Sequence, residues 1–541
     1  MSIGSSIRTF VGRARSFLRN RDANVAMMFG LSVIPLTVAA GAGIDMTRAM
    51  IVKSAMTEAL DAASLAVGST PGLTQAQMNT LAQNFFNANY HIDSSYGTPQ
   101  PVSVTPNGQS VTVSTHVPMP TILMTIVGLN SMDVNSSSTV VWGQTKLWVS
   151  FVLDNTGSMT QTDGTGTSKI SALKTAVGQV LTMLQNASNN PGDVQAAIIP
   201  FSKTVNVGTA NVNASWIDWT DWLAAPSGGA PAALLGPGDS CPWSTGSNGF
   251  TCQTTPTNGS STTNTIPSSG TYKGYICPSQ VSVYNSATGQ GGHDFNGCYT
   301  SVATGSTQTV ATGSSATCGS HHNCSCTGSG SSKSCKASLY NHVWTTNSTS
   351  TWGGCIMDRT QSNDVNNTSP TNAATDFPAE NAYSCVPSVL IGLGYNWTTL
   401  NAQVNAMTAQ GSTNQTIGLD WGWMAQTQGN PLSAPALPAN TTQYIILVSD
   451  GLNTQDRWSG DGSNEDSGTD ARMALACTNA KAAGFIIYAV FVDLNGTQGN
   501  STVLQNCASD ANKYFDLQTS GAIITTLNAI GQEITNVRVS H

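Results

Sequence analysis

The chain has 541 residues and a mass of 56.1 kDa, enough for about two to four domains with a substantial core. Only 9% of the residues are charged, compared with roughly a quarter in ordinary soluble domains, and the net charge is -8. This balance offers no basic stripe, which argues against nucleic acid as a partner. A neutral surface rich in Ser, Thr, Asn and Gly is typical of secreted or cell-surface proteins.

Residues 25–44 (VAMMFGLSVIPLTVAAGAGI) contain no charged side chain, and a run of this length is predicted to cross a bilayer as a helix. The preceding tail, residues 1–24, is basic, so the positive-inside rule predicts a cytoplasmic N-terminus and an external remainder. The charged residues of the tail are Arg8, Arg13, Arg15, Arg19, Arg21 and Asp22.

The alternative to a membrane anchor is a cleaved signal peptide, because VAAGAG at residues 38–43 offers small side chains to a peptidase. Two features favour the anchor. The apolar run is longer than the usual signal-peptide core of about 7–15 residues, and residues 45–68 are predicted to continue it as an amphipathic helix. That helix would carry Met50, Ala55, Leu60 and Leu65 near one face.

Residues 69–145 are predicted to form a small α+β region. Residues 102–117 alternate as two short strands around the turn sequence Pro106-Asn107-Gly108. Residues 120–141 follow with a short apolar helix and another strand.

The segments RDANVAMMFGLSVIPLTVAAGAGIDMTRAM (21–50) and ALDAASLAVG (59–68) resemble the N-terminal part of the TadE/TadG family of bacterial tight-adherence (Flp) pilus assembly proteins. Pro35 inside the apolar run, and Asp45 and Asp61 after it, stand at the matching positions. The resemblance implies a single-pass protein of the bacterial inner membrane, with its N-terminus inside and the bulk of the chain periplasmic or at the cell surface.

From Lys146 onward, predicted strands alternate with predicted helices, a pattern that indicates an α/β fold with a parallel sheet. The strands are near-continuous apolar runs, as expected where both faces of a sheet are covered. We expect strands at 147–153, 194–201, 444–450 and 485–493, and helices at 168–185 and 471–484. In such sheets ligands bind beyond the carboxyl ends of the strands.

Oxygen-bearing side chains follow two of these strands. Asp154, Thr156 and Ser158 come after the first strand, Asp450 ends the run 444–450, and Thr413 lies in a Gly-Ser-Thr-Asn turn before a helix. We expect the three segments to converge on one rim. Hydroxyl and carboxylate oxygens suit hard cations such as Mg²⁺. The simpler alternative is that Asp154 and Ser158 only cap the helix that follows.

The arrangement resembles the von Willebrand factor type A (VWA) domain and its metal-ion-dependent adhesion site, with Thr156 in place of the first serine of Asp-x-Ser-x-Ser. The resemblance implies a Rossmann-like, mostly parallel sheet built from residues 146–208 and 386–541. It also implies Mg²⁺, or Mn²⁺ or Ca²⁺, bound directly by the three hydroxyls and directly or through water by the two aspartates. An acidic group of a protein partner would complete the coordination shell.

Residues 209–385 are an insertion that such a domain does not need. The chain has 12 cysteines, none before Cys241 and none in a CxxC motif, which predicts disulfides formed in an oxidising compartment. The insertion holds ten of them, enough for up to five bridges of open connectivity. Within it, His321, His322, Cys324 and Cys326 could instead bind zinc. Trp216, Trp219 and Trp222 are expected to pack against the domain rather than to form an exposed binding surface.

Two features lie beyond the last metal-site aspartate. The loop 453–470 is rich in acids but lacks EF-hand spacing, so we expect a solvated acidic rim rather than a Ca²⁺ loop. Cys477 and Cys507 flank the strand 485–493 outside the main cysteine cluster, and we predict that they form a disulfide.

No P-loop, HExxH or nucleophile-elbow motif is present, so we do not expect an enzyme. The hypothesis is a membrane-anchored, TadG-like pilus assembly protein or minor pilus component. Its external VWA domain would bind a protein partner through the metal. That partner would be another pilus assembly component. The alternative is a surface adhesin that binds host or matrix ligands directly.

Overall fold

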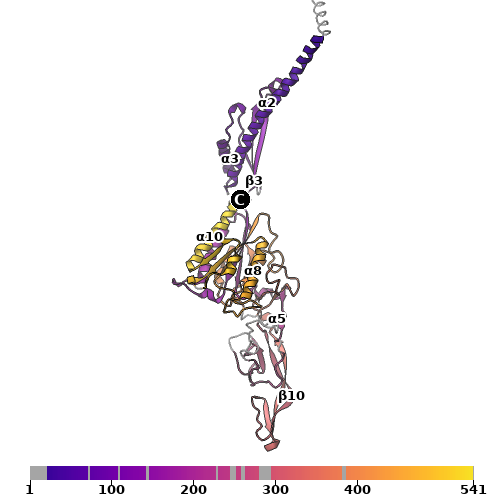
Figure 1. The fold of residues 1–541 in the computed structure, drawn as a ribbon, viewed down its shortest axis with the longest axis vertical. Coiled ribbons are helices and arrows are strands. Elements are labelled where there is room, and N and C mark those ends of the chain that lie inside the picture. The colour runs from indigo at the N-terminus through magenta and orange to yellow at the C-terminus, as the bar shows by residue number, and fades with distance from the viewer. Residues whose placement is uncertain are drawn as a thin grey trace, which may run out of the picture. The chain divides into compact units, whose positions relative to one another are not determined.

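The computed structural model describes residues 21–70, 73–107, 110–141, 145–226, 229–243, 252–256, 262–278, 294–380, 385–496 and 498–539. Most of the predicted cytoplasmic tail, residues 1–24, therefore lies outside the described residues. The chain forms two compact units, Met1–Gln144 with Val539–His541, and Thr145–Arg538 (Figure 1). Residues 209–385 belong to the second unit and do not form a unit of their own.

The first unit is organised by one long helix, α2 (Arg21–Gly68), with Pro35 inside it. Among the described residues, α2 from Val25 onward is the one helix long and apolar enough to cross a membrane. Its apolar side chains are exposed in the first half, as Phe29 and Leu31 illustrate. No break separates this half from the second, which packs on the rest of the unit.

The second half of α2 covers α3 (Gln75–Asn89) and an antiparallel sheet ordered β1-β2-β3. The strands are β1 (Ser103–Asn107), β2 (Ser110–Pro120) and β3 (Ser131–Val141). The buried face of α2 comprises Ala49, Val52, Met56, Ala59, Leu60, Ala63 and Val67.

The predicted face of this helix was wrong in two positions, because Met50 is 63% and Leu65 61% exposed. A spacing of five residues advances about 140° around a helix, so such a set cannot share one side, whereas steps of three and four can. The predicted apolar helix within 120–141 is only a 3-10 turn, η2 (Met124–Val127). It ends at Gly128, whose φ of 86° is readily adopted only by glycine.

The second unit is built on a mostly parallel sheet that contains all four predicted strands. Its parallel part is ordered β5-β4-β16-β17-β18, so the first strand lies inside the sheet and the chain crosses over to both sides of it. These strands are β4 (Lys146–Asp154), β5 (Val194–Phe201), β16 (Thr441–Ser449), β17 (Ile486–Val492) and β18 (Tyr514–Leu517). Three short antiparallel strands extend or flank β5, namely β6 (Val205–Asn206), β13 (Cys355–Ile356) and β15 (Ile391–Gly394).

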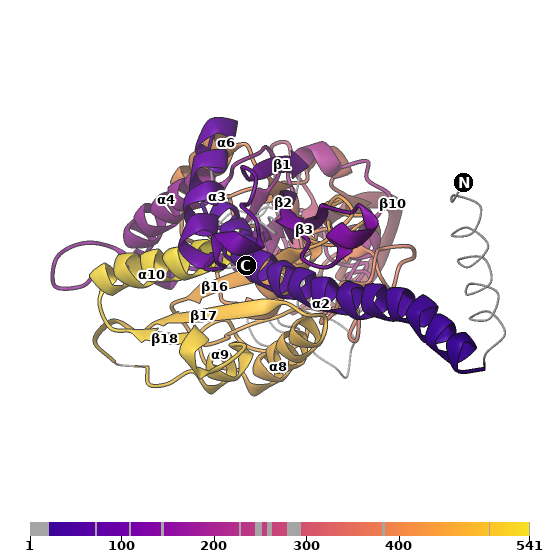
Figure 2. The ribbon, with the colours of Figure 1, turned by 90° about the horizontal axis from the view of Figure 1, so that it is seen from above.

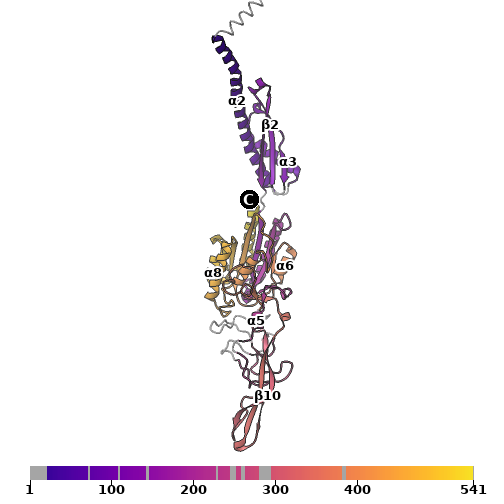
Figure 3. The same ribbon diagram turned by 90° about the vertical axis from the view of Figure 1, so that its right-hand side faces the viewer.

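Helices cover both faces of this sheet, as Figures 2 and 3 show. One face packs on α4 (Lys169–Ala187), α6 (Trp397–Ala406) and α10 (Ser520–Val539). The other packs on α7 (Gln415–Met424), α8 (Ser467–Ala482) and α9 (Thr502–Cys507). The inner part of the sheet is therefore buried on both sides, which explains why β4, β5, β16 and β17 are nearly uninterrupted apolar runs.

The inserted segment forms a separate antiparallel sheet ordered β11-β12-β10-β9-β8. Its strands are β8 (Cys252–Gln253), β9 (Tyr275–Pro278), β10 (Gly297–Thr312), β11 (Cys324–Thr327) and β12 (Ser334–Thr346). Nearer the core, β7 (Ile217–Asp218) pairs with β14 (Phe377–Pro378), and α5 (Thr220–Leu223) follows β7.

The chain leaves for this sheet and returns from it at adjacent points. The Trp222 indole donates to the Asn347 carbonyl over 3.1 Å, and the Trp344 indole donates to the Leu223 carbonyl over 3.1 Å. Trp216 and Trp222 are buried, and Trp219 packs edge-on against Trp222 and Trp352. These tryptophans are packing residues and not an exposed binding surface.

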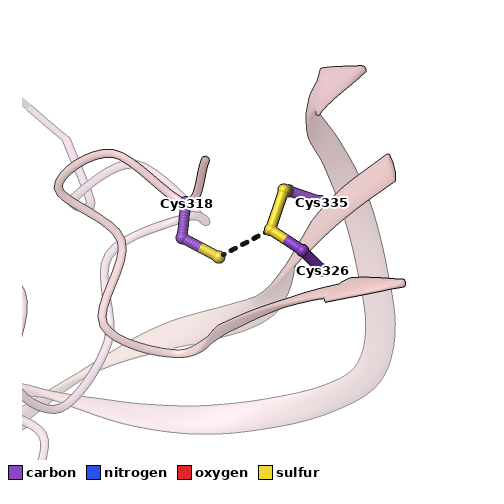
Figure 4. Close-up of side chains that lie close together, drawn as sticks. All are labelled: Cys318, Cys326 and Cys335. Carbon is purple, nitrogen blue, oxygen red and sulfur yellow. Dashed lines mark hydrogen bonds between the residues drawn. A yellow bond between two sulfur atoms is a disulfide. The ribbon is translucent and has the colours of Figure 1, made fainter. Parts of the chain in front are cut away.

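All twelve cysteines are paired. The bridges are Cys241–Cys252, Cys277–Cys298, Cys318–Cys324, Cys326–Cys335, Cys355–Cys385 and Cys477–Cys507. The alternative of a zinc site at residues 321–326 is wrong, because Cys324 and Cys326 both form disulfides. Two of the bridges lie close together, because Cys318 Sγ is 3.6 Å from Cys326 Sγ. Figure 4 shows this contact beside the Cys326–Cys335 bridge.

Candidate metal centre

The two aspartates of the candidate site lie at the carboxyl ends of neighbouring parallel strands. Asp154 is the last residue of β4, and Asp450 directly follows β16, which pairs with β4. Both are fully buried. The Ser449 hydroxyl donates to Asp154 Oδ2 over 2.6 Å, and the Asp450 backbone N–H donates to the same oxygen over 3.4 Å. Strand pairing thus places the Asp154 carboxylate beside Ser449 and the backbone of Asp450.

The turn after β4 adds two hydroxyls to this pair. Ser158 Oγ donates to Asp450 Oδ1 over 2.7 Å and lies 3.0 Å from Thr156 Oγ1, which is itself 3.4 Å from Asp450 Oδ1. The Thr156 N–H donates to Asp154 Oδ1 over 2.8 Å, which folds the turn back over the end of its strand. The 3-10 helix η3 (Gly157–Thr160) that follows has no side-chain cap, and the next α-helix, α4, is capped by Ser168. Capping of that helix by Asp154 or Ser158 is therefore not what the structure contains.

Thr413 reaches the same rim from a second loop. It precedes Asn414, the N-cap of α7, and its N–H donates to Thr454 Oγ1 over 2.9 Å. The Gly157 N–H donates to the Gly411 carbonyl over 3.0 Å, which holds this loop against the β4 turn. A Cβ on Gly451 would lie 3.6 Å from Thr413 Oγ1 and 4.0 Å from Ser158 Oγ, so both hydroxyls border that glycine.

A lysine that the sequence analysis missed enters the centre as well. Lys169 Nζ donates to Asp450 Oδ2 over 2.7 Å and to Gln161 Oε1 over 2.9 Å, and the Lys169 side chain is fully buried. Lys169 is the first residue of α4. A cation is disfavoured at the positive end of a helix dipole, and this mismatch was the signal available in the sequence.

The centre contains two buried carboxylates and one ammonium group, so the lysine alone does not neutralise it. The pKa of Asp154 is raised to about 7, first by burial and then by the charge of Asp450, against the lowering effect of hydrogen bonds from Ser449 and Thr156. A hard divalent cation would balance this charge, and every nearby ligand atom is an oxygen. The residues present therefore fit such an ion.

Buried amides hold the loops that carry these ligands. Gln415 Nε2 donates to Ser449 Oγ over 3.0 Å and to the Gly451 carbonyl over 2.8 Å, while Asn453 Oδ1 accepts from the Gln415 N–H over 2.8 Å. Asn414 Nδ2 donates to both carboxylate oxygens of Asp358. Burial, followed by the charges of Asp456 and Asp364, raises the pKa of Asp358 to about 8.

The predicted solvated acidic rim is only partly correct. Asp461 and Glu465 are exposed, but Asp456 is buried and accepts backbone N–H groups from Trp458 and Ser459. Asp466 is the N-cap of α8. Part of this acidity therefore builds the loop and does not face solvent.

Residues 23–70 match a family model described as putative Flp pilus-assembly TadE/G-like. This segment is TadE/G-like. The match spans the apolar half of α2 and most of its packed half. No curated protein matches the chain.

Several solved structures are similar at low identity. The pilus adhesin SpaC from Lactobacillus rhamnosus GG is 11% identical over 80% of this chain and 34% of its own, with a TM-score of 0.30. The vWF domain of the type V pili tip protein Mfa5 from Porphyromonas gingivalis is 8% identical over 73% and 97%, with a TM-score of 0.32. The PilB minor pilin from Streptococcus sanguinis is 10% identical over 84% and 82%, with a TM-score of 0.31. The chain thus spans about a third of SpaC.

Proposed function

We propose that this protein is a membrane-anchored pilus component whose unit Thr145–Arg538 is a VWA-type domain that binds a protein partner through a metal ion. Asp154, Thr156, Ser158, Thr413 and Asp450 would hold the ion, which is Mg²⁺ or, failing that, Mn²⁺ or Ca²⁺. The ion would offer a coordination position to a carboxylate of the partner. The apolar half of α2 would cross the bacterial inner membrane once, with the N-terminus inside.

The observation that carries the proposal is the distance of 2.7 Å between Ser158 Oγ and Asp450 Oδ1, side chains that are 292 positions apart in the chain. Structural capping needs no such meeting of distant loops at the end of a parallel sheet, whereas an ion that draws ligands from several loops does. The excess negative charge of the centre supports a cation there. The TadE/G-like segment supports a role in the pilus and not in catalysis.

The roles of the residues differ within this proposal. The two aspartates would supply charge, and the hydroxyls would supply neutral ligands that leave the ion attractive to an acidic partner. Lys169 would neutralise Asp450 Oδ2, the oxygen that it contacts at 2.7 Å, and so keep a second full negative charge from the ion. Gln415 and Asn453 would hold the ligand-bearing loops in position through their hydrogen bonds.

The test compares capture of pilus components by the full-length protein in Mg²⁺ and in chelator. Asp154→Asn removes a charge without changing side-chain size, and Asp461→Asn, on an exposed acid of the nearby loop, is the matched control. We expect the chelator and Asp154→Asn to abolish capture, while Asp461→Asn retains it. Circular dichroism of each variant checks folding. Capture that persists both in chelator and in Asp154→Asn would remove the metal from the mechanism.

Deletion of the gene for this protein distinguishes a role in pilus assembly from a role as a surface adhesin. Loss of pili is expected if the protein acts in assembly. Intact pili that no longer adhere would instead identify it as a direct binder of host or matrix ligands.

A further inference from the structure

A short apolar loop in the first unit is fixed to α2 by a buried carboxylate. Asp45 is fully buried, and its oxygens accept backbone N–H groups from Ile122 (2.9 Å), Leu123 (3.1 Å) and Met124 (3.0 Å). Arg48, one turn further along α2, donates to the Pro120 carbonyl over 3.0 Å. The loop residues 121–130 are thus held at a defined point of the helix.

That point is the end of the apolar run 25–44. A Cβ on Gly41 would lie 2.6 Å from Leu123 Cβ, so the loop approaches the helix more closely than any larger residue would allow. Twenty helical residues extend about 30 Å, the thickness of a bilayer core. A helix that crosses the membrane over residues 25–44 would therefore bring this loop to the boundary between acyl chains and headgroups.

The outward surface of the loop carries four large aliphatic side chains beside two polar residues, Thr125 and Asn130. Ile122, Ile126, Val127 and Leu129 are 57%, 68%, 49% and 51% exposed. Ile44 and Met46 on the adjoining turn of α2 are also exposed, and the loop contains no charged residue. Such a group of large aliphatic side chains is costly in water but favourable in the outer part of a bilayer.

We propose that residues 121–130 insert into the external leaflet of the membrane beside α2, so that the protein holds the bilayer by a helix and a loop together. The proposal rests on the part of the proposed function in which α2 spans the membrane. The apolar surface of the loop is continuous with that of the spanning helix, which favours lipid over a protein partner as its occupant. The Arg48 guanidinium stacks 4.7 Å over the Tyr96 ring just beyond the loop, a pair suited to the headgroup level.

Asp45 explains how the loop stays at that depth. An unpaired carboxylate at the membrane boundary would be costly, as would loop N–H groups without acceptors. The three hydrogen bonds satisfy both at once. A single spanning helix is otherwise free to rotate and tilt, whereas a second insertion point beside it restricts both motions.

The test measures the depth of spin labels in full-length protein reconstituted into phosphatidylethanolamine/phosphatidylglycerol vesicles. Since all native cysteines are paired, a single new cysteine can be labelled selectively. The test variants are Ile126→Cys and Val127→Cys, both at exposed positions that tolerate a label. Leu36→Cys marks the span, and Thr80→Cys marks water, because α3 packs on α2 beyond Ala59.

We expect the ratio of oxygen to nickel-chelate accessibility at positions 126 and 127 to exceed that at 80 several-fold and to approach that at 36. A lipid reading at 36 with a water reading at 126 and 127 would overturn the loop insertion and leave the anchor intact. A water reading at 36 would overturn the anchor and the loop insertion together. Shielding of positions 126 and 127 from both reagents would indicate a protein occupant and would also overturn the inference.

Discussion

Lys169 Nζ lies 2.7 Å from Asp450 Oδ2, and neither side chain is exposed to solvent. The lysine comes from the start of α4 and the aspartate from the end of β16, so the pair joins the helix to the rim of the sheet. The candidate metal centre therefore contains a cation of the protein's own. The stabilisation that this ammonium gives to Asp450 can be compared with the stabilisation that a divalent ion gives.

Replacing Lys169 by Met leaves Asp450 buried without its partner. Loss of one member of a buried ion pair typically costs about 3–5 kcal/mol, so we expect a loss of this order in the free energy of unfolding in chelator. Mg²⁺ should recover part of it and raise the melting temperature more in the variant than in the wild type. Lys174→Met is the control, because Lys174 lies on the same helix and donates to the Asn405 carbonyl, away from the candidate metal centre. An equal Mg²⁺ shift in wild type and Lys169→Met would contradict this prediction.

Asp163, in the loop before α4, makes the stability of the fold dependent on acid pH, because it joins this loop to Ser520 at the start of α10. The Thr165 hydroxyl and then the Ser520 N–H lower the pKa of Asp163 from 3.8 to about 2. The unfolded chain therefore takes up this proton first, and the stabilisation is present above pH 3.8 and disappears as the pH falls toward about 2. We expect the difference in melting temperature between wild type and Asp163→Asn to be largest near neutral pH, to shrink below pH 3.8 and to vanish only below about pH 2. A difference that is constant with pH would rule out this linkage.

The Cys477–Cys507 bridge joins α8 to α9 across 30 positions of the chain. Its removal in the double variant Cys477→Ser/Cys507→Ser should cost about 3–4 kcal/mol, mainly because the unfolded chain gains freedom. Denaturant unfolding measures the loss, and thiol titration of Cys507→Ser alone should find one free thiol, at position 477. Removing the Cys318–Cys324 bridge, which closes only 6 positions, should cost less. A larger effect at the short bridge would argue against the chain-entropy explanation.

Asp45 and Asp61 occupy the same helix but differ in burial, since Asp45 is fully buried and Asp61 exposed. Asp45→Asn removes the charge that accepts three backbone N–H groups, and hydrogen bonds to a charged group contribute about 1.5–3 kcal/mol each. We expect amide hydrogen exchange at Ile122, Leu123 and Met124 to become faster, while Asp61→Asn leaves it unchanged. Unaltered exchange in Asp45→Asn would show that the loop is held by other contacts.

The parallel strands β4, β5, β16 and β17 could be predicted from the sequence because each is buried on both faces and appears as an apolar run, whereas β18 is only partly buried and gave no such signal. β4, for example, extends the predicted run 147–153 by one residue at each end. The short strands β6, β13 and β15 carried no such signal. They contain two to four residues, and their pairing is imposed by the tertiary contacts around β5.

The candidate ligands could be predicted because each follows a recognisable strand or precedes a helix. Lys169 was missed because its distance to Asp450 depends on how α4 crosses the sheet, which local sequence does not specify. The disulfide between Cys477 and Cys507 was suggested by their isolation from the other ten cysteines. The bridges within the cluster could not be assigned, because ten cysteines allow many pairings.

The two indole hydrogen bonds at the base of the inserted sheet have an evolutionary consequence. Since the chain departs after Leu223 and rejoins at Trp344, residues between them can lengthen, shorten or be exchanged at a small entropic cost, which grows only slowly with loop length. The rim that carries Asp154 and Asp450 is built by other segments and would keep its geometry throughout such changes. Changes of length or sequence in the inserted segment can thus accumulate without displacing the side chains of the candidate metal centre.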